Sequence, residues 1–329
     1  MKKDFLRCIV VGAGRIALSH IPHMIAHPKT QLVGIVEPNF FMRFVMKRLL
    51  NVPVYKSINQ INDDQFDAAF ILTPPNVHYN LSKYFLNKRK HVFLEKPLTL
   101  DPMHSEFLLK LAQENYVQFT CGYVYRHHPI YLKLKDFINC GEYGMPLKCN
   151  IRMVGNVVNS DSPKTWRSTG KGAGCLYDYG CHAIDLGMFL FGQPSSVTCL
   201  SKDELFQAGV IDRFTAKLHY EKSAYSETEI YCNWADKKVR KAGLTVEVHT
   251  EDNIISTDGQ AITIKGAHDE RYSIKDLDTD VTYYLRGEEF QNQINAFIIN
   301  ACNGKFEYLD VADAVKCDAI ISELYEAKL

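Results

Sequence analysis

The sequence has no net charge and no apolar run long enough to cross a membrane. Lys and Arg together number 38, as do Asp and Glu, so the basic excess of most nucleic-acid-binding proteins is missing. No segment approaches the roughly 18 consecutive apolar residues of a transmembrane helix. The apolar run between Arg7 and Gly12 is too short for a secretory signal. We therefore expect a cytoplasmic protein with neither a nucleic-acid nor a membrane partner.

Cysteine pairs with the spacing of metal or redox sites are also missing. The chain has 10 cysteines, but no pair reads C-x-x-C, which argues against zinc-finger and thioredoxin-like sites. Several, such as Cys8 and Cys121, lie inside apolar runs, as buried reduced thiols do. His20, His23 and His27 recur along the first predicted helix, where a metal patch is one reading and a solvated helix face is the favoured one. We expect no bound metal.

No internal repeat or low-complexity linker divides the 329 residues, and this length favours two domains. In the first third, short apolar runs alternate with amphipathic stretches, which predicts a parallel sheet covered by helices on both faces. The expected strands are Leu6–Val11, Gln31–Val36, Val52–Tyr55, Asp67–Leu72, His91–Leu94 and Val117–Cys121. The expected helices are Ile16–Ala26, Phe41–Leu50, Val77–Leu86 and Pro102–Glu114.

After Gly122 the pattern changes to strands that alternate polar and apolar residues, which is typical of a large, mostly antiparallel sheet with one open face. We expect an α/β protein with a doubly wound domain over residues 1–122 and an α/β domain over residues 123–329. The strands expected in the second domain are Leu147–Val154, Ser196–Leu200, Phe214–Tyr220, Ser226–Tyr231, Leu244–His249, Asn253–Thr257 and Ala261–Lys265. The helices expected there are Pro129–Asn139, His182–Phe191, Glu288–Asn300 and Val311–Glu326.

A glycine-rich turn links the first predicted strand to the first predicted helix. Gly12, Gly14 and Ala17 follow the G-x-G-x-x-G/A pattern, in which the glycines allow a tight turn and close approach of a pyrophosphate. Glu37 ends the second strand 20 residues after Ala17, where an acidic residue accepts from the ribose hydroxyls of NAD. An ordinary strand–turn–helix junction is the alternative.

The cofactor preference depends on charge near Glu37. A carboxylate about 4 Å from the 2′-phosphate of NADP costs about 4 kcal/mol per unit charge pair at an effective dielectric near 20. Arg43, or less favourably Lys47, offers a cation that offsets this repulsion from the next helix. We therefore predict NAD as cofactor, with NADP possible.

Polar residues in the middle of the chain suggest catalytic chemistry. Lys96 directly follows a buried strand, at the edge of the sheet where ligands bind in open α/β folds, although a surface lysine at a strand exit is the plain alternative. Asp178, His182 and Asp185 recur at i, i+4 and i+7 and share one face if the segment is helical. An exposed polar helix face is the alternative, and one His with two carboxylates underfills a metal shell.

These segments together resemble the Gfo/Idh/MocA oxidoreductases. The matching runs cover essentially the whole chain and read GAGRIA, TPPNVH, EKP, GYVYRHHP and DYGCHAID. The resemblance implies a Rossmann domain followed by an α/β domain whose open sheet often mediates oligomers, hence a homodimer or homotetramer. The family's usual run of three glycines reads Gly172-Ala173-Gly174 in this chain.

The resemblance also implies roles for individual residues. Lys96, His182 and Asp178 match the catalytic positions. The residues that match substrate positions are Arg126, Trp166, Arg167 and Asp185. The residues that match cofactor positions are Gly12, Gly14, Arg15, Ile16, Glu37, Thr73, Pro74, His78, Glu95, Lys96 and Tyr123.

The implied activity is hydride transfer between NAD(P) and a CH–OH group of a sugar, sugar phosphate, nucleotide sugar or inositol. Among these, the chain looks most like sugar and nucleotide-sugar 3-dehydrogenases or 3-ketoreductases. His182, oriented by Asp178, suits the base at neutral pH, and Lys96 favours negative charge on the substrate oxygen. The alternatives are a non-catalytic NAD(P)-sensing regulator on the same scaffold, as in the yeast galactose-regulon repressor, and a reductase of an apolar substrate related to biliverdin reductase.

Overall fold

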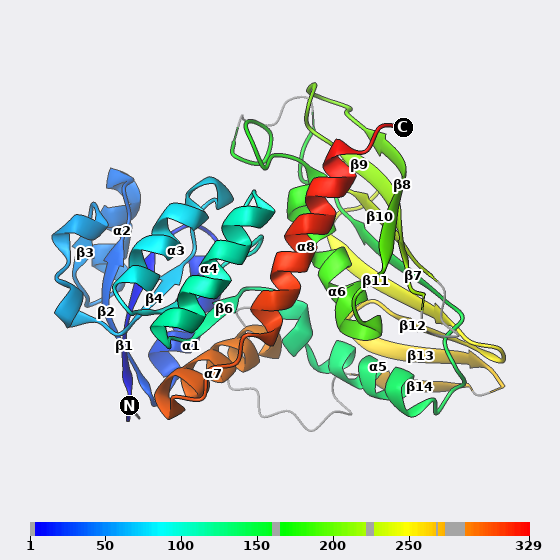
Figure 1. The fold of residues 1–329 in the computed structure, drawn as a ribbon, viewed down its shortest axis with the longest axis horizontal. Coiled ribbons are helices and arrows are strands. Elements are labelled where there is room, and N and C mark those ends of the chain that lie inside the picture. The colour runs from blue at the N-terminus through cyan, green and yellow to red at the C-terminus, as the bar shows by residue number, and fades with distance from the viewer. Residues whose placement is uncertain (1–3, 160–164, 222–226, 268, 274–286) are drawn as a thin grey trace. The chain divides into compact units, whose positions relative to one another are not determined.

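The computed structural model describes residues 4–159, 165–221, 227–267, 269–273 and 287–329. The chain folds into two compact units, which Figure 1 shows as ribbons. The first unit comprises residues 1–124 and 281–315, and the second comprises residues 125–280 and 316–329. The chain therefore returns to the first unit near its end, which the sequence did not indicate. The domain division at residue 122 stays a prediction.

The first unit contains the predicted doubly wound sheet. Six parallel strands lie in the order β3-β2-β1-β4-β5-β6, with the reversal of strand order between β1 and β4. Their bounds are β1 Leu6–Val11, β2 Thr30–Val36, β3 Val54–Tyr55, β4 Ala68–Ile71, β5 His91–Leu94 and β6 Phe119–Cys121. In doubly wound sheets, ligands bind outside the carboxyl ends of the strands at such a reversal.

Among the described residues of this unit, five α-helices lie wholly within it. They are α1 Ala17–Ala26, α2 Phe40–Leu49, α3 His78–Asn87, α4 Pro102–Asn115 and α7 Glu288–Asn303. Strand β1 and helices α1 and α7 share one apolar core, into which α7 places Ile294, Phe297 and Ile298. The Phe297 ring packs edge-on against Phe70 of β4 at a centroid distance of 5.2 Å. This apolar side of α7 is why the chain returns to the first unit.

The second unit contains an eight-stranded sheet in the order β14-β13-β12-β11-β7-β10-β9-β8. All neighbouring pairs are antiparallel except β7 and β10. The bounds are β7 Lys148–Val154, β8 Ser196–Asp203, β9 Arg213–His219, β10 Glu227–Asn233, β11 Gly243–His249, β12 Asn253–Thr257, β13 Ala261–Gly266 and β14 Glu270–Ser273. The predicted α/β class with a mostly antiparallel second sheet is confirmed, although β14 was not predicted.

Helices α5 Pro129–Cys140 and α6 Cys181–Phe191 cover one face of this sheet (Figure 1). A Cβ on Gly187 of α6 would lie 3.2 Å from Leu218 of β9 and 3.6 Å from Ile151 of β7, so the helix packs closely on the apolar side chains. The alternate residues of these strands point to the opposite face, as the pleat of a sheet requires. That opposite face carries polar and charged side chains.

A π-helical turn, Leu176–Gly180, directly precedes α6. The sequence predicted a helix over His182–Phe191, so a π-helical turn directly before it was not foreseen. The last helix, α8, runs from Leu309 to Glu326 and crosses the unit boundary between residues 315 and 316. Across the described ranges, no helix is both long and apolar enough to span a membrane.

Candidate active site

The glycine turn between β1 and α1 is shaped for a ligand to approach the backbone. Gly12 has φ of +95°, and a Cβ there would lie 2.8 Å from the Leu72 carbonyl oxygen, so only glycine fits. At Gly14 the added Cβ would meet no described atom within 4 Å. Ile16 is the N-cap of α1, and no side chain in the described structure caps this helix. The turn therefore presents open space at a helix N-terminus, where phosphate groups bind.

Glu37 directly follows β2, beside this turn, and is buried, with 8% of its surface exposed. Its Oε2 accepts from the Ala13 N–H at 2.8 Å, and its Oε1 accepts from the Asn39 N–H at 2.7 Å. Arg43 Nη1 instead donates to the carbonyl oxygens of Glu37 at 3.0 Å and Pro38 at 2.6 Å. The carboxylate is thus fixed by main-chain donors against the glycine turn.

His78 connects the segments that follow β4 and β5. The imidazole is fully buried, with Nδ1 2.8 Å from the Pro97 carbonyl oxygen and Nε2 2.9 Å from that of Thr73. Burial lowers the pKa of His78, against the opposing effect of the two carbonyls. This geometry makes His78 a link between the two segments, and its predicted contact with cofactor stays a prediction.

Glu95 is held at the end of β5 by a histidine that sequence reasoning placed wrongly. His20 and His23 were expected on a solvated face, but both are buried. His20 Nε2 lies 2.8 Å from Glu95 Oε1, and its ring packs edge-on against Phe93 and Phe290 at 5.1 and 5.3 Å. The side of α1 that carries His20 faces this aromatic core, which the spacing of histidines alone could not show.

Lys96 follows Glu95 directly and is half-buried. Glu95 Oε2 accepts from the Lys96 main-chain N–H at 3.2 Å, so both oxygens of this carboxylate have a donor. A Cβ on Gly122 of the neighbouring segment would lie 3.1 Å from Glu95 Cα and 3.2 Å from its Oε1, so the absence of a side chain there leaves room for the carboxylate. The main chain at Lys96 is therefore anchored on its N-terminal side.

The second unit holds the other predicted catalytic residues. Asp178 lies on the π-helical turn and accepts from Arg167 Nε at 2.9 Å. The Arg167 guanidinium lies 4.3 Å from the ring centroid of Trp166. His182, on α6, packs edge-on against Tyr125 at 5.0 Å. The structure thus joins Arg167 to Asp178, a pair that the sequence did not indicate, and the orientation of His182 by Asp178 stays a prediction.

A second ion pair involves Asp185 of α6, three residues after His182. Asp185 is 1% exposed and Arg126 is 6% exposed. Arg126 Nε donates to Asp185 Oδ1 at 2.9 Å and Oδ2 at 3.0 Å, and its Nη2 lies 2.8 Å from Oδ1. Two of the four predicted substrate residues, Arg126 and Asp185, are therefore paired with each other. No group of three metal-binding side chains occurs in the part of the chain that the structure describes.

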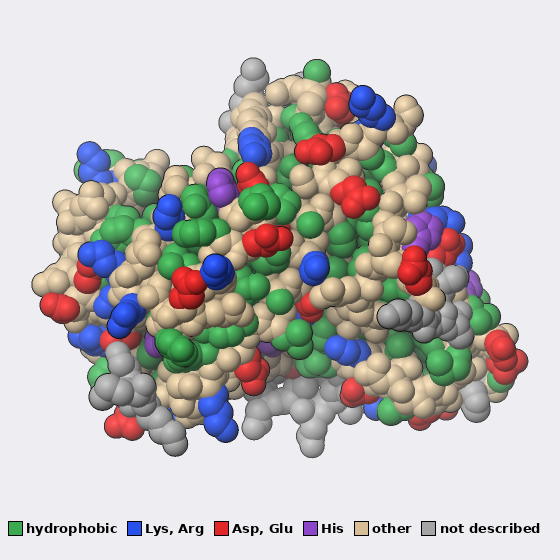
Figure 2. All heavy atoms as spheres, in the orientation of Figure 1, with side chains coloured by type: hydrophobic (Ala, Val, Ile, Leu, Met, Phe, Trp, Pro, Cys, Tyr) green, Lys and Arg blue, Asp and Glu red, His purple; other side chains and the backbone are tan. Residues whose placement is uncertain are grey.

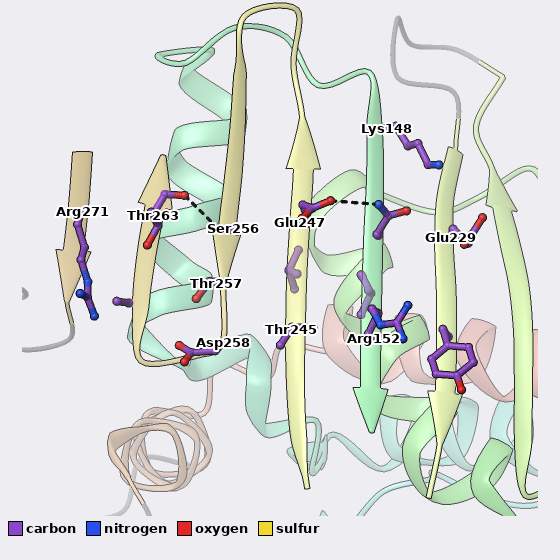
Figure 3. A pocket seen from close by; sticks show the side chains of 15 residues that line it. Lys148, Arg152, Glu229, Thr245, Glu247, Ser256, Thr257, Asp258, Thr263 and Arg271 are labelled. Atoms are coloured by element: carbon purple, nitrogen blue, oxygen red, sulfur yellow. Dashed lines mark hydrogen bonds between the residues drawn. The ribbon is translucent and has the colours of Figure 1, made fainter. Parts of the chain in front are cut away.

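A cavity of about 660 Å³ opens on the face of the eight-stranded sheet opposite α6. Figure 3 shows side chains of both charge signs that reach into it from several strands, including Lys148, Arg152, Glu229 and Arg271. Asn150 Nδ2 donates to Glu247 Oε1 at 3.5 Å across two neighbouring strands (Figure 3). This surface is mostly polar, unlike the face under the helices.

Residues 6–123 match the sequence family described as an oxidoreductase family with an NAD-binding Rossmann fold, and residues 131–256 match the GFO/IDH/MocA C-terminal domain. The chain belongs to the Gfo/Idh/MocA oxidoreductase family. Its first unit is accordingly an NAD-binding Rossmann domain. The open turn at Gly14 and the carboxylate of Glu37 fit that cofactor.

Named relatives include two scyllo-inositol 2-dehydrogenases and a glucose-6-phosphate 3-dehydrogenase, all of Bacillus subtilis. The scyllo-inositol 2-dehydrogenase (NADP(+)) IolW of Bacillus subtilis is 30% identical over 163 residues, which are 49% of this chain and 45% of the relative. The chain spans about half the length of the first curated relatives that it matches.

Solved structures share the fold over nearly the whole chain. The UDP-N-acetylglucosamine 3-dehydrogenase GnnA of Acidithiobacillus ferrooxidans has a TM-score of 0.78 at 19% identity, covering 97% of this chain and 96% of its own. The 3-ketoreductase KijD10 of Actinomadura kijaniata has a TM-score of 0.81 at 18% identity, covering 98% and 97%.

Proposed function

We propose that the protein is an NAD-dependent dehydrogenase or reductase that acts on a hydroxyl or keto carbon of a sugar, sugar phosphate, nucleotide sugar or inositol. The observation that carries this proposal is the anchored Glu95–Lys96 segment at the carboxyl end of β5, in the same unit as the glycine turn. The relatives named as inositol and nucleotide-sugar dehydrogenases support the substrate class.

The cofactor is held by the carboxyl edge of the parallel sheet. Gly12, Gly14, Arg15 and Ile16 bind the diphosphate at the N-terminus of α1, and Glu37 accepts from the adenosine ribose. The residues that line the rest of the site are Thr73, Pro74, His78, Glu95, Lys96 and Tyr123. Bound NAD supplies the carbon that accepts or returns the hydride.

The proton chemistry is assigned to three side chains, His182, Asp178 and Lys96. His182 accepts the proton of the substrate hydroxyl, since an imidazole has both forms available near neutral pH. Asp178, fixed by Arg167, supports the imidazolium that forms. The Lys96 ammonium stabilises negative charge on the substrate oxygen.

The substrate is bound by the loop and helix residues of the second unit. Trp166 and Arg167 form a cation–π pair that offers both a flat apolar surface and donors to a sugar ring. Arg126 and Asp185 complete this group, and their mutual pairing fixes both side chains before substrate arrives.

The polar face of the eight-stranded sheet is the proposed contact between copies, in a homodimer or homotetramer. Its alternating Lys, Arg and Glu side chains allow charge pairing across a twofold axis. Arg152→Glu should weaken this contact, and sedimentation of the variant should then shift toward a monomer. An unchanged sedimentation profile would place the contact elsewhere.

A substrate panel tests the activity. The protein is incubated with NAD or NADP and with myo-inositol, scyllo-inositol, glucose 6-phosphate or UDP-N-acetylglucosamine, and the absorbance of the reduced nicotinamide is followed. Lys96→Met keeps the length of the stem but removes the charge, so turnover should fall by at least ~10²-fold while the dissociation constant of NADH changes little.

Two results would oppose the proposal. Near-normal turnover by Lys96→Met would remove this lysine from the chemistry. Binding of NADH without turnover of any polyol or sugar would favour a non-catalytic sensor on the same scaffold.

A further inference from the structure

Helix α2 exposes several large aromatic side chains to solvent. Phe40, Phe41 and Phe44 are 77%, 68% and 50% exposed, whereas Met46 is the one buried residue of the helix and is 2% exposed. On the face shown in Figure 2, hydrophobic side chains reach the surface at several places. Single exposed residues need no explanation, but three phenylalanines on one short helix form a patch that does.

The segment around this patch carries charge of one sign. Residues 38–62 contain no Asp or Glu, although the whole chain has 38 acidic and 38 basic residues. The same segment contains the cations Arg43, Lys47, Arg48 and Lys56. A local excess of four positive charges in a neutral chain favours an anionic partner.

The aromatic and basic side chains lie on the same side of the helix. Phe41, Phe44 and Arg48 follow the i, i+3 and i+7 spacing of one helical face, on the side away from buried Met46, and Lys47 flanks them. The Arg48 guanidinium lies 5.0 Å from the ring centroid of Phe44. We call Phe41, Phe44, Lys47 and Arg48 the basic–aromatic face.

A second copy of the chain is a poor occupant for this face. A twofold contact through it would bring the cations of one copy against those of the other, and like charges in contact oppose association. A lipid surface requires no matching groove. Basic helices that present aromatic side chains bind at the boundary between headgroups and acyl chains.

We propose that the basic–aromatic face docks on a membrane surface that contains anionic lipid. The phenylalanine rings enter the interface, while Lys47 and Arg48 lie beside lipid phosphates. This revises the expectation of no membrane partner, which rested on the lack of a spanning segment. Arg43 is left out of the face because it donates to the carbonyl oxygens of Glu37 and Pro38, beside the predicted cofactor site. Phe40 is left out because its ring centroid lies 5.8 Å from the Arg43 guanidinium.

Vesicle flotation tests this proposal with the full-length protein. One set of vesicles is phosphatidylcholine alone, and the other is phosphatidylcholine with about one third phosphatidylglycerol. Phe41→Ser/Phe44→Ser should lower the partition coefficient about 10-fold or more. Lys47→Gln/Arg48→Gln should lower it about 5-fold per cation removed, and salt should weaken the wild type in the same way.

Matched controls come from helix α4 of the same unit. Met103→Ser removes an apolar side chain that is 69% exposed, and Lys110→Gln removes an exposed cation, so neither should change flotation. Unchanged circular dichroism and NADH binding in all variants show that the fold is intact.

Wild-type flotation with the anionic vesicles and its loss in both double variants support the proposal. Failure of the wild type to float, or equal flotation of wild type and variants, overturns it. Self-association that the Phe41→Ser/Phe44→Ser variant abolishes, without vesicle binding, also overturns it and assigns the face to a second copy.

Discussion

The two units hold their polar site residues in different ways. In the first unit, main-chain groups contribute most of the partners: Glu37 accepts from two main-chain N–H groups, and His78 lies between two carbonyl oxygens. In the second unit, side chains hold one another, as Arg167 holds Asp178 and Arg126 holds Asp185. Main-chain partners persist through most substitutions, whereas a side-chain partner disappears with a single one.

This difference matches what each part has to bind under the proposed function. A dinucleotide presents the same diphosphate and ribose groups in every relative, so donors supplied by the fold are sufficient. A substrate varies among relatives, and residues whose partners are other side chains are free to change in pairs. The second unit is therefore where substitutions should have the strongest effects.

The largest effect is expected at His182. His182→Asn removes the base, so the rate should fall ~10²–10⁴-fold, and the basic limb of kcat/KM in the oxidation direction should vanish. Asp178→Asn should cost less, because it weakens the support of the imidazolium without removing the base. Steady-state kinetics against pH with any substrate found in the panel measures both. An unchanged pH profile in the His182→Asn variant would show that His182 is a structural residue and not the base.

Arg126 tests the side-chain pairing of the second unit directly. Arg126→Met leaves the buried Asp185 carboxylate without its guanidinium, and breaking a buried ion pair costs about 3–5 kcal/mol in the free energy of unfolding. Removing both charges, in Arg126→Met/Asp185→Leu, should restore most of that loss. Urea unfolding measures both variants. A double variant as unstable as the single one would show that the pair is not a unit.

His128 gives a smaller, pH-dependent effect in the second unit. Its Nδ1 accepts from the Ile130 N–H at 3.3 Å at the start of α5, and burial lowers its pKa to about 4. In the unfolded chain this imidazole has a pKa near 6.5 and therefore binds a proton more readily than in the folded protein. The free energy of unfolding is highest above pH ~6.5 and falls by up to about 3 kcal/mol as the pH falls toward ~4.

His128→Asn keeps a capping side chain that does not titrate. It should therefore flatten this part of the acid dependence, whereas the exposed His104→Asn should not. Thermal unfolding measured from about pH 4 to about pH 7 distinguishes the two variants, because this interval spans both pKa values of the histidine. A slope as steep as that of the wild type in His128→Asn would assign the acid sensitivity to other groups, such as buried His78.

The helices and strands were predicted well, because the local order of apolar and polar residues largely determines them. Strands Leu6–Val11 and His91–Leu94 have the predicted bounds, since each is an apolar run between polar residues. The burial of His20 was missed because it depends on Phe290, which is far away in sequence. The return of α7 to the first unit depends in the same way on contacts that no local pattern encodes.

At the candidate site, residue spacing along the sequence predicted less than it did for the helices and strands. The i, i+4 argument for Asp178 and His182 assumes α-helical turns, but Asp178 lies on a π-helical turn, in which hydrogen bonds run from i to i+5. Spacing singled out Asp178, His182 and Asp185 as candidates, whose catalytic and substrate roles stay predictions. The partners of the two carboxylates lie before the helix, with Arg167 pairing with Asp178 and Arg126 with Asp185. Long, flexible arginine side chains leave no periodic signal in a sequence.

The smallest expected effect is at Glu37, where main-chain donors fix the side chain. Glu37→Gln keeps one oxygen acceptor but turns an NH2 donor toward the second main-chain N–H, so the free energy of unfolding should fall by about 1–3 kcal/mol. Because the variant also removes the charge, the preference for NADH over NADPH should fall. The repulsion toward a 2′-phosphate that is lost is about 1 kcal/mol for a pair of charges in bulk water and about 4 kcal/mol at an effective dielectric near 20. The ratio of dissociation constants should therefore change by about 5-fold at least. Arg43→Gln is the opposite comparison, because it removes the cation beside Glu37 that offsets repulsion of a 2′-phosphate, so it should weaken NADPH binding more than NADH binding. Titration of tryptophan and tyrosine fluorescence with each nucleotide gives both ratios. If the wild type bound NADPH more tightly than NADH, the attraction of the 2′-phosphate to Arg43 would exceed its repulsion by Glu37, even though Arg43 also donates to main-chain carbonyl oxygens.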